Sequence, residues 1–150
     1  MVISAAISLE PYVNMENVSY LFKNSLQHIV ERYVMVLQRV TVEDIMQTFD
    51  TLINTYCEDI RGMSKPILEV LLAAFENYCK DDDNDNAMFT AMSTLECVSS
   101  ILMNACDNPA ICDDLVSIVL PVIMVSECEI CCTKVNSVYG YHFEIRNNNV

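Results

Sequence analysis

Residues 18–37 read VSYLFKNSLQHIVERYVMVL, and their spacing decides the fold class. Apolar side chains recur there every three or four residues, which places them on one face of an α-helix. The same pattern returns at residues 42–60, 64–79, 86–106 and 109–126. Two Gly and four Pro in 150 residues are too few for the many tight turns of a β-sandwich. The sequence therefore predicts an all-α protein of long helices.

Capping residues predict where these helices begin and end. Thr41 and Asp44 have the spacing of a capping box, in which each side chain satisfies a free backbone N–H of the first helical turn. Gly62 is expected to end the second helix, and Ser64 to cap the third. Asn108 is expected to cap the fifth helix.

The first, third and fifth helices repeat one another. Leu26, Ile29 and Val30 align with Ile67, Val70 and Leu71 at an offset of 41 residues, and these align with Leu115, Ile118 and Val119 at an offset of 48. A two-helix unit recurring at about 40 to 47 residues is typical of HEAT and armadillo repeats. We therefore expect an α-solenoid of about 2.5 HEAT-like helical hairpin repeats. A closed helical bundle is the alternative architecture.

The expected solenoid covers residues 1–126. Residues 127–150 show little periodicity and are rich in Cys and Asn. We expect them to form a divergent tail that is poorly ordered or irregular.

The charge of the chain bears on its partners. Eight Lys and Arg stand against twenty-one Asp and Glu, which gives a net charge of −13 and a pI near 4.2. Nucleic acid is a poor partner for such a surface, because binding depends on cations that neutralise phosphates, whereas a basic protein is a good one. No secretory signal is evident at the start, and the longest apolar run, 115–125, is too short to cross a bilayer. We expect a soluble intracellular protein without membrane contacts.

The cysteines predict thiols rather than a metal site. Five of the eight lie singly in the helical patterns and are expected to be buried and reduced: Cys57, Cys79, Cys97, Cys106 and Cys112. Cys128, Cys131 and Cys132 form a cluster with no second pair to complete a zinc site, so reducible surface thiols are the favoured interpretation.

No motif indicates catalysis. Asp81, Asp83 and Asp85 have the spacing of a calcium loop, but Asn86 and Met92 stand where that loop needs Gly and Glu. Glycine-rich phosphate loops, serine elbows and zinc-protease motifs are missing from the sequence. We expect no enzyme activity, no cofactor and no metal.

The second helix carries a polar ridge opposite its apolar stripe. Carboxylate and amide side chains recur there every three or four residues, at Glu43, Gln47, Asp50, Asn54 and Glu58. A solvated helix face is one interpretation of this ridge. The other is a docking strip for a partner rich in Lys and Arg, provided that a neighbouring helix presents its polar side to the same surface.

The chain resembles the karyopherin-β nuclear transport receptors, and specifically their importin seven/eight branch. The resemblance rests on four stretches in matching order, 2–9, 42–60, 85–102 and 108–122, of which Thr90-Ala91-Met92 with the preceding acidic loop is the most telling. It covers about residues 2 to 125. Family members are several times longer, so the chain resembles an internal segment of a receptor, and the tail departs from the family pattern.

The resemblance implies a fold and a function. It implies HEAT repeats whose inner helices lie near 42–60 and 86–106 and whose outer helices lie near 18–38, 64–79 and 110–126. It also implies transport of basic cargo, such as ribosomal proteins and histones, into the nucleus. In the full-length family, Ran-GTP releases the cargo and Phe-Gly nucleoporins guide passage through the pore, so the chain is expected in nucleus and cytoplasm.

Candidate cargo-binding residues follow from the ridge and its acidic surroundings. The main candidates are Glu43, Asp50 and Glu58, and the secondary ones are Asp44, Asp59, Asp81, Asp82, Asp83 and Asp85. The alternative function is that of an independent acidic helical bundle, an adaptor or regulator that binds a partner helix in a groove.

Overall fold

The structure is a computed structural model that describes residues 2–15, 19–37, 43–80 and 87–125. All elements in these residues are helices, and no strand occurs among them. The prediction of an all-α protein is therefore confirmed. The tail predicted at 127–150 and the acidic loop at 81–86 lie outside the described residues.

Five long helices form the body of the molecule, as the periodicity predicts. Two short helices at residues 2–7 and 10–13 were not predicted by the apolar pattern, because one or two turns are too short to show a period. In chain order the elements are α1 (Val2–Ile7), α2 (Glu10–Val13), α3 (Ser19–Leu37), α4 (Glu43–Thr55), α5 (Cys57–Ile60), the 3-10 helix η2 (Arg61–Met63), α6 (Ser64–Cys79), α7 (Ala87–Ala105) and α8 (Pro109–Val125).

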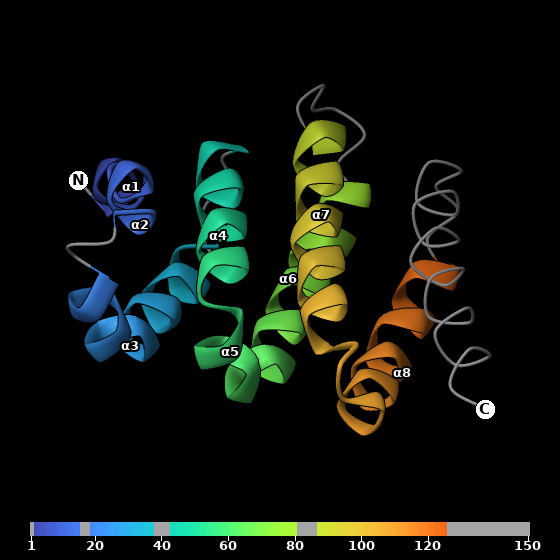
Figure 1. Cartoon of the computed structure of the whole chain (residues 1–150). Coiled ribbons are helices and arrows are strands. Elements are labelled where there is room, and N and C mark those ends of the chain that lie inside the picture. The colour runs from blue at the N-terminus through green and yellow to red at the C-terminus, as the bar shows by residue number, and fades with distance from the viewer. Residues whose placement is uncertain (1, 16–18, 38–42, 81–86, 126–150) are drawn as a thin grey trace.

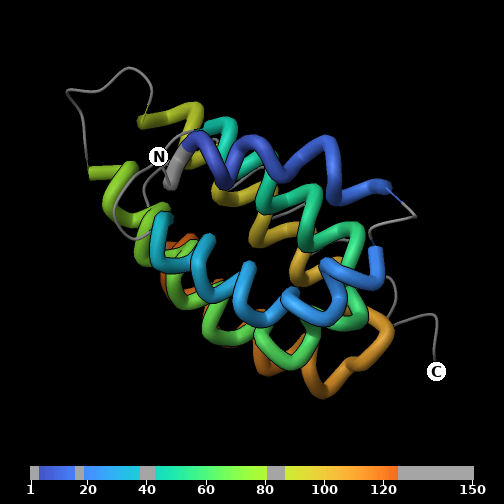
Figure 2. The backbone as a smooth tube through the Cα atoms, turned by 90° about the vertical axis from the view of Figure 1, so that its left-hand side faces the viewer, coloured from blue at the N-terminus to red at the C-terminus, as the bar shows by residue number. Residues whose placement is uncertain are grey.

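The helices lie in two layers. One layer holds α1, α4 and α7, and the other holds α3, α6 and α8 (Figures 1 and 2). Within a layer, helices that follow one another are in contact: α1 with α4, α4 with α7, α3 with α6 and α6 with α8. The most extensive contacts join α7 to α6 and to α4. Helices α1 and α8 lie at opposite ends of the row (Figure 1).

The hydrophobic core lies between the two layers. Phe49 of α4 and Phe75 of α6 are fully buried there. The apolar residues that recur every three or four positions in 42–60 are all buried: Ile45, Phe49, Leu52, Ile53, Tyr56 and Ile60. At the predicted positions the core therefore follows the period of the helices.

Two apolar residues that fit the helical spacing are exposed. Leu21 of α3 is 51% exposed and Met88 of α7 is 47% exposed. In each case the adjacent residue, Phe22 or Ala87, is the buried one. Neighbours on a helix point about 100° apart, so at the edge of an apolar face one residue can be buried while the next is exposed.

The second predicted helix is divided at Tyr56. This residue has φ −116° and ψ 32°, outside the helical region, and separates α4 from α5. Its hydroxyl donates to the carbonyl of Val13 at 3.1 Å, and its ring stacks on that of Phe22 at 5.9 Å between centroids. The break occurs where Tyr56 contacts residues that are distant in the sequence. The spacing of apolar residues within one helix cannot predict such contacts.

The predicted stop at Gly62 and the predicted cap at Ser64 are wrong. Gly62 lies within η2, has no positive φ, and is followed directly by α6. Ser64 is the first residue of α6, with Met63 at the cap position. The cap at Asn108 is confirmed, since its Oδ1 accepts the Ile111 N–H at 3.4 Å. The capping box at Thr41 lies outside the described residues.

The prediction of buried cysteines holds for only part of the set. Cys97 and Cys112 are buried, Cys57 and Cys106 are half-buried, and Cys79 is exposed. Cys79 is the last residue of α6, where the helix ends and less of its surface is covered.

Candidate functional site

The predicted ridge lies mainly on α4, where amides hold its carboxylates. Gln47 Nε2 donates to Glu43 Oε1 at 3.1 Å, and Asn54 Nδ2 donates to Asp50 Oδ2 at 2.9 Å. Both pairs are four residues apart, which is one turn of a helix. Glu58 lies on α5, beyond the break at Tyr56.

The neighbouring helix α7 presents polar side chains to the same surface. Ser100 Oγ donates to Asp50 Oδ1 at 2.6 Å, and Asn104 Nδ2 donates to Asn54 Oδ1 at 3.4 Å. Asn54 Nδ2 also reaches Ser100 Oγ at 3.3 Å. The condition set for a docking strip, a neighbouring polar helix, is therefore met.

We call this combined surface the α4–α7 strip. It consists of Glu43, Gln47, Asp50 and Asn54 of α4 with Glu96, Ser100 and Asn104 of α7. The three residues of α7 were missed by the sequence analysis. Their spacing of four residues on the side opposite the apolar stripe of residues 86–106 was the signal that could have found them.

The strip covers a buried thiol that joins its two helices. Cys97 Sγ donates to the carbonyl of Met46 at 3.5 Å. Burial raises the pKa of Cys97 well above its usual value, and the charges of Asp50 and Glu96 raise it further. The thiol is therefore neutral at pH 7, and the negative charges of Asp50 and Glu96 help to keep it protonated.

The strip is negative and rich in hydrogen-bond acceptors. Glu43 and Glu96 are exposed, Asp50 is half-buried, and no Lys or Arg belongs to the strip. A carboxylate has about four lone-pair sites, so bonds from one neighbouring amide, and at Asp50 also from the Ser100 hydroxyl, leave it able to accept more. The surface therefore suits groups that donate N–H bonds and carry positive charge.

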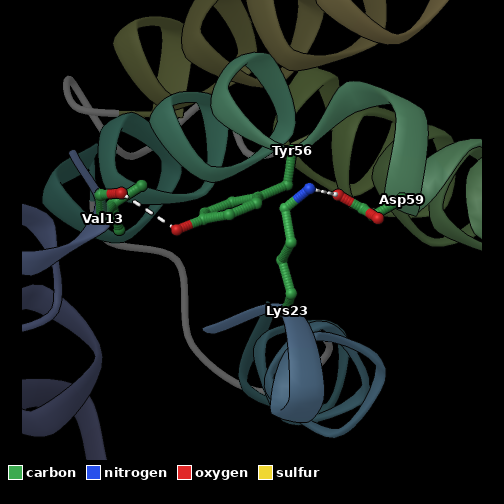
Figure 3. A network of polar contacts seen from close by, with 4 residues as sticks. All are labelled: Val13, Lys23, Tyr56 and Asp59. Carbon is green, nitrogen blue, oxygen red and sulfur yellow. Dashed lines mark hydrogen bonds and ion pairs between the residues drawn. The ribbon is translucent and has the colours of Figure 1, made fainter. Parts of the chain in front are cut away.

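The other predicted site residues are arranged differently. Glu58 Oε1 contacts Arg61 Nη2 at 2.9 Å, and Asp59 Oδ2 contacts Lys23 Nζ of α3 at 3.2 Å. Figure 3 shows that Lys23 reaches Asp59 from α3, so this carboxylate of α5 faces α3. The carboxylates of Glu58 and Asp59 therefore each form an ion pair with a cation of this chain.

Of the secondary candidates, only Asp44 remains to be placed among the described residues. It is exposed and directly follows Glu43, at the start of α4. The other candidates lie outside the described residues: Asp81, Asp82, Asp83 and Asp85.

A small pocket lies at the end of the strip, between α5 and α7. Cys57, Arg61 and Asn104 are among the residues that line it. The Nε atom of Arg61 is buried and has no hydrogen-bond partner. Arg61, which forms an ion pair with Glu58, places a positive charge at this end of the otherwise negative surface.

The described residues contain no group of three His, Cys, Asp or Glu side chains that could hold a metal ion. The cluster of Cys128, Cys131 and Cys132 lies outside them. In the same part of the chain, no helix has both the length and the apolar character needed to cross a bilayer. No family model, curated protein or solved structure was found to match the chain.

Proposed function

We propose that the chain is a segment of a nuclear import receptor of the importin seven/eight type, and that the α4–α7 strip binds basic cargo. The observation that carries this proposal is the strip itself, with three carboxylates, three amides and no cation on two adjacent helices. The segment acts by non-covalent binding and not by catalysis.

A repeated structure supports the HEAT solenoid in this proposal. The three aligned triplets of the outer helices have the same burial, in the order buried, half-buried, buried: Leu26, Ile29, Val30; Ile67, Val70, Leu71; Leu115, Ile118, Val119. Equivalent positions in stacked repeats have equivalent surroundings, so this agreement is what a solenoid requires.

The other layer repeats as well. Thr48 of α4 and Thr94 of α7 are both fully buried. Each donates its hydroxyl to the carbonyl four residues earlier, Thr48 to Asp44 at 2.8 Å and Thr94 to Thr90 at 2.7 Å. The division of the long helices into two layers also agrees with the inner and outer helices that the family resemblance implies.

The energetics favour many weak contacts with cargo. An exposed ion pair contributes roughly 0–1 kcal/mol and weakens as salt rises. Three carboxylates on one strip therefore give an affinity that depends on the sum of the pairs and on ionic strength. A cargo segment with several Lys or Arg residues matches this pattern better than one with a single cation.

The test is binding of a labelled peptide rich in Lys and Arg, measured by fluorescence anisotropy at low and at physiological salt. The strip variant combines Glu43→Gln, Asp50→Asn and Glu96→Gln, which neutralise the three carboxylates of the α4–α7 strip. Loss of three weak pairs should raise Kd by about tenfold at low salt. The variant should also show a weaker dependence on salt.

A matched control removes the same charge from the other layer. Glu31→Gln, Glu69→Gln and Asp114→Asn change one exposed carboxylate on each of α3, α6 and α8. This control should keep most of the affinity for the peptide, since it changes the net charge of the protein but not the α4–α7 strip. Equal weakening by both variants would show that net charge and not the strip binds the peptide.

The roles of the whole receptor are proposed only for the longer protein to which this segment belongs. They comprise release of cargo by Ran-GTP, contact with Phe-Gly nucleoporins, and movement between nucleus and cytoplasm. Binding of Ran-GTP or of a Phe-Gly peptide to the isolated segment is not required by the proposal.

A further inference from the structure

Two cysteines lie close together where α7 meets α8. Cys106 directly follows the last residue of α7, and Cys112 lies in the first part of α8, where its N–H donates to the carbonyl of Asn108 at 2.9 Å. Their sulfur atoms are 4.0 Å apart. A disulfide has a bond length of about 2.05 Å, so the two atoms need to approach by roughly 2 Å.

The two sulfurs differ in their access to solvent. Cys112 is 1% exposed, whereas Cys106 is half-buried and donates its thiol to the carbonyl of Leu102 at 3.2 Å. Burial raises the pKa of Cys112 to about 12, with further contributions from Cys106 and Asp113. Cys112 is therefore protonated at neutral pH, and Cys106 is the sulfur that a reagent in solution reaches first.

We propose that Cys106 and Cys112 form a reversible disulfide, with a low-molecular-weight disulfide such as oxidised glutathione as the oxidant. The Cys106 thiolate attacks one sulfur of oxidised glutathione, which forms a mixed disulfide and releases one glutathione thiolate. The Cys112 sulfur then loses its proton and displaces the second glutathione from Cys106. Two protein thiols are oxidised, one glutathione disulfide is reduced to two thiols, and the two protons pass to the glutathione thiolates.

The bond would close a short covalent ring, residues 106–112, across the turn between the two helices. It replaces the hydrogen bond from Cys106 to Leu102 and fixes the start of α8 to the end of α7. A disulfide stabilises a protein mainly by restricting its unfolded chain, so the oxidised form should resist unfolding. This inference is independent of cargo binding.

The first experiment maps the bond in the full chain. Purified protein is equilibrated in equal concentrations of reduced and oxidised glutathione, blocked with an alkylating reagent, and cleaved before Asp without reduction. Cleavage at Asp107 and Asp113 releases the peptide DNPAIC, residues 107–112, whose only cysteine is Cys112. Mass spectrometry should find most of this peptide linked to the fragment 85–106.

Two variants identify the second sulfur, because the fragment 85–106 contains both Cys97 and Cys106. Cys97→Ser should leave the link in place, and Cys106→Ser should abolish it. The proposal is overturned if DNPAIC is recovered mainly as the alkylated thiol. It is overturned equally if the peptide is linked mainly to a fragment that lacks Cys106.

The second experiment measures thermal unfolding. Oxidation should raise Tm by roughly 5 °C or more, and dithiothreitol should reverse the rise. The exposed Cys79 supplies the matched control, since Cys79→Ser should leave the rise unchanged. A Tm that does not respond to oxidation, in protein shown by mapping to carry the bond, would contradict the proposed fixing of α8.

Discussion

At the scale of single residues, two tyrosines attach the short N-terminal helices to the rest of the molecule. Tyr33 Oη donates to the carbonyl of Ala6 at 2.6 Å, and Tyr56 Oη donates to the carbonyl of Val13 at 3.1 Å. These carbonyls lie in the last turns of α1 and α2, where backbone acceptors have no partner within the helix. The Ala6 carbonyl also accepts the Leu9 N–H at 3.2 Å, so the Tyr33 hydroxyl gives it a second hydrogen bond.

The first prediction concerns Tyr33→Phe. The ring of Tyr33 stacks on Phe49 at 5.4 Å between centroids, and phenylalanine keeps this contact. The variant loses only the hydroxyl, and the Ala6 carbonyl keeps its bond from the Leu9 N–H. The free energy of unfolding should therefore fall by about 0.5–1.5 kcal/mol, as measured by denaturant titration. The control is Tyr20→Phe, at a residue that is 63% exposed. It should change stability by less than about 0.5 kcal/mol.

The same variant has an effect at alkaline pH that a lost contact alone would not produce. Burial, with a smaller contribution from Glu10, raises the pKa of Tyr33 from 10.0 to about 12. Above pH 10 an unfolded tyrosine releases its proton while the folded one keeps it, so the unfolded state binds fewer protons and stability falls as pH rises. Tyr33→Phe should remove part of this fall. Parallel stability curves for the two proteins between about pH 9 and 11 would contradict the raised pKa.

At the scale of elements, the junction between α4 and α6 shows how tertiary contacts override local signals. The chain bends at Tyr56, where no helix-breaking residue stands, and stays helical through Gly62. At the bend, the Tyr56 hydroxyl donates a hydrogen bond to the Val13 carbonyl and the Tyr56 ring stacks on Phe22. Both partners lie outside α4, so the sequence of that helix does not indicate these contacts.

The second prediction concerns Gly62→Ala. A Cβ atom at this position meets no atom within 4 Å, and the residue has no positive φ that would favour glycine. Alanine restricts the unfolded chain more than glycine does, so unfolding should require about 0.5–1 kcal/mol more free energy. The reverse change at exposed Ala73 of α6, Ala73→Gly, should lower stability by about 1 kcal/mol. A loss of stability in Gly62→Ala would show that the position needs glycine after all.

The strip also belongs to the scale of elements, because neither helix forms it alone. On α4 the sequence shows a regular polar face, which a solvated helix would have as well. The bonds from Ser100 to Asp50 and from Asn104 to Asn54 join this face to α7. The break at Tyr56 and the Arg61 contact give Glu58 surroundings different from those of the α4 residues.

At the scale of the whole molecule, the arrangement is a row with two ends. The helices in extensive contact are neighbours in the same layer or partners across the two layers, and α1 and α8 stand at opposite ends (Figure 1). A closed bundle would instead bring its first and last helices together. The arrangement therefore favours the solenoid interpretation over the adaptor bundle.

The third prediction concerns the shape in solution. A compact domain of this length has a radius of gyration of roughly 15 Å. Small-angle scattering at several protein concentrations should give a clearly larger value that does not depend on concentration or salt, because the described helices are arranged in a row and not around one centre. A monomer near the compact value would favour the closed bundle and remove the basis for the proposed receptor function.

The sequence by itself determined the helical class, the five long helices and most of the core. These features depend on the spacing of apolar residues along one helix, and Ile45, Phe49 and Leu52 are buried as that spacing requires. Capping was predicted correctly at Asn108, where the bond joins residues three apart, and incorrectly at Gly62 and Ser64.

Only the tertiary structure decided which polar residues meet. Asp50 and Ser100 are fifty positions apart, as are Asn54 and Asn104, and Lys23 of α3 pairs with Asp59 of α5. It also decided the bend at Tyr56 and the approach of Cys106 to Cys112. Periodicity gives the direction of a side chain around its own helix axis. The partner of that side chain depends on how the helices pack, which is set by the whole core.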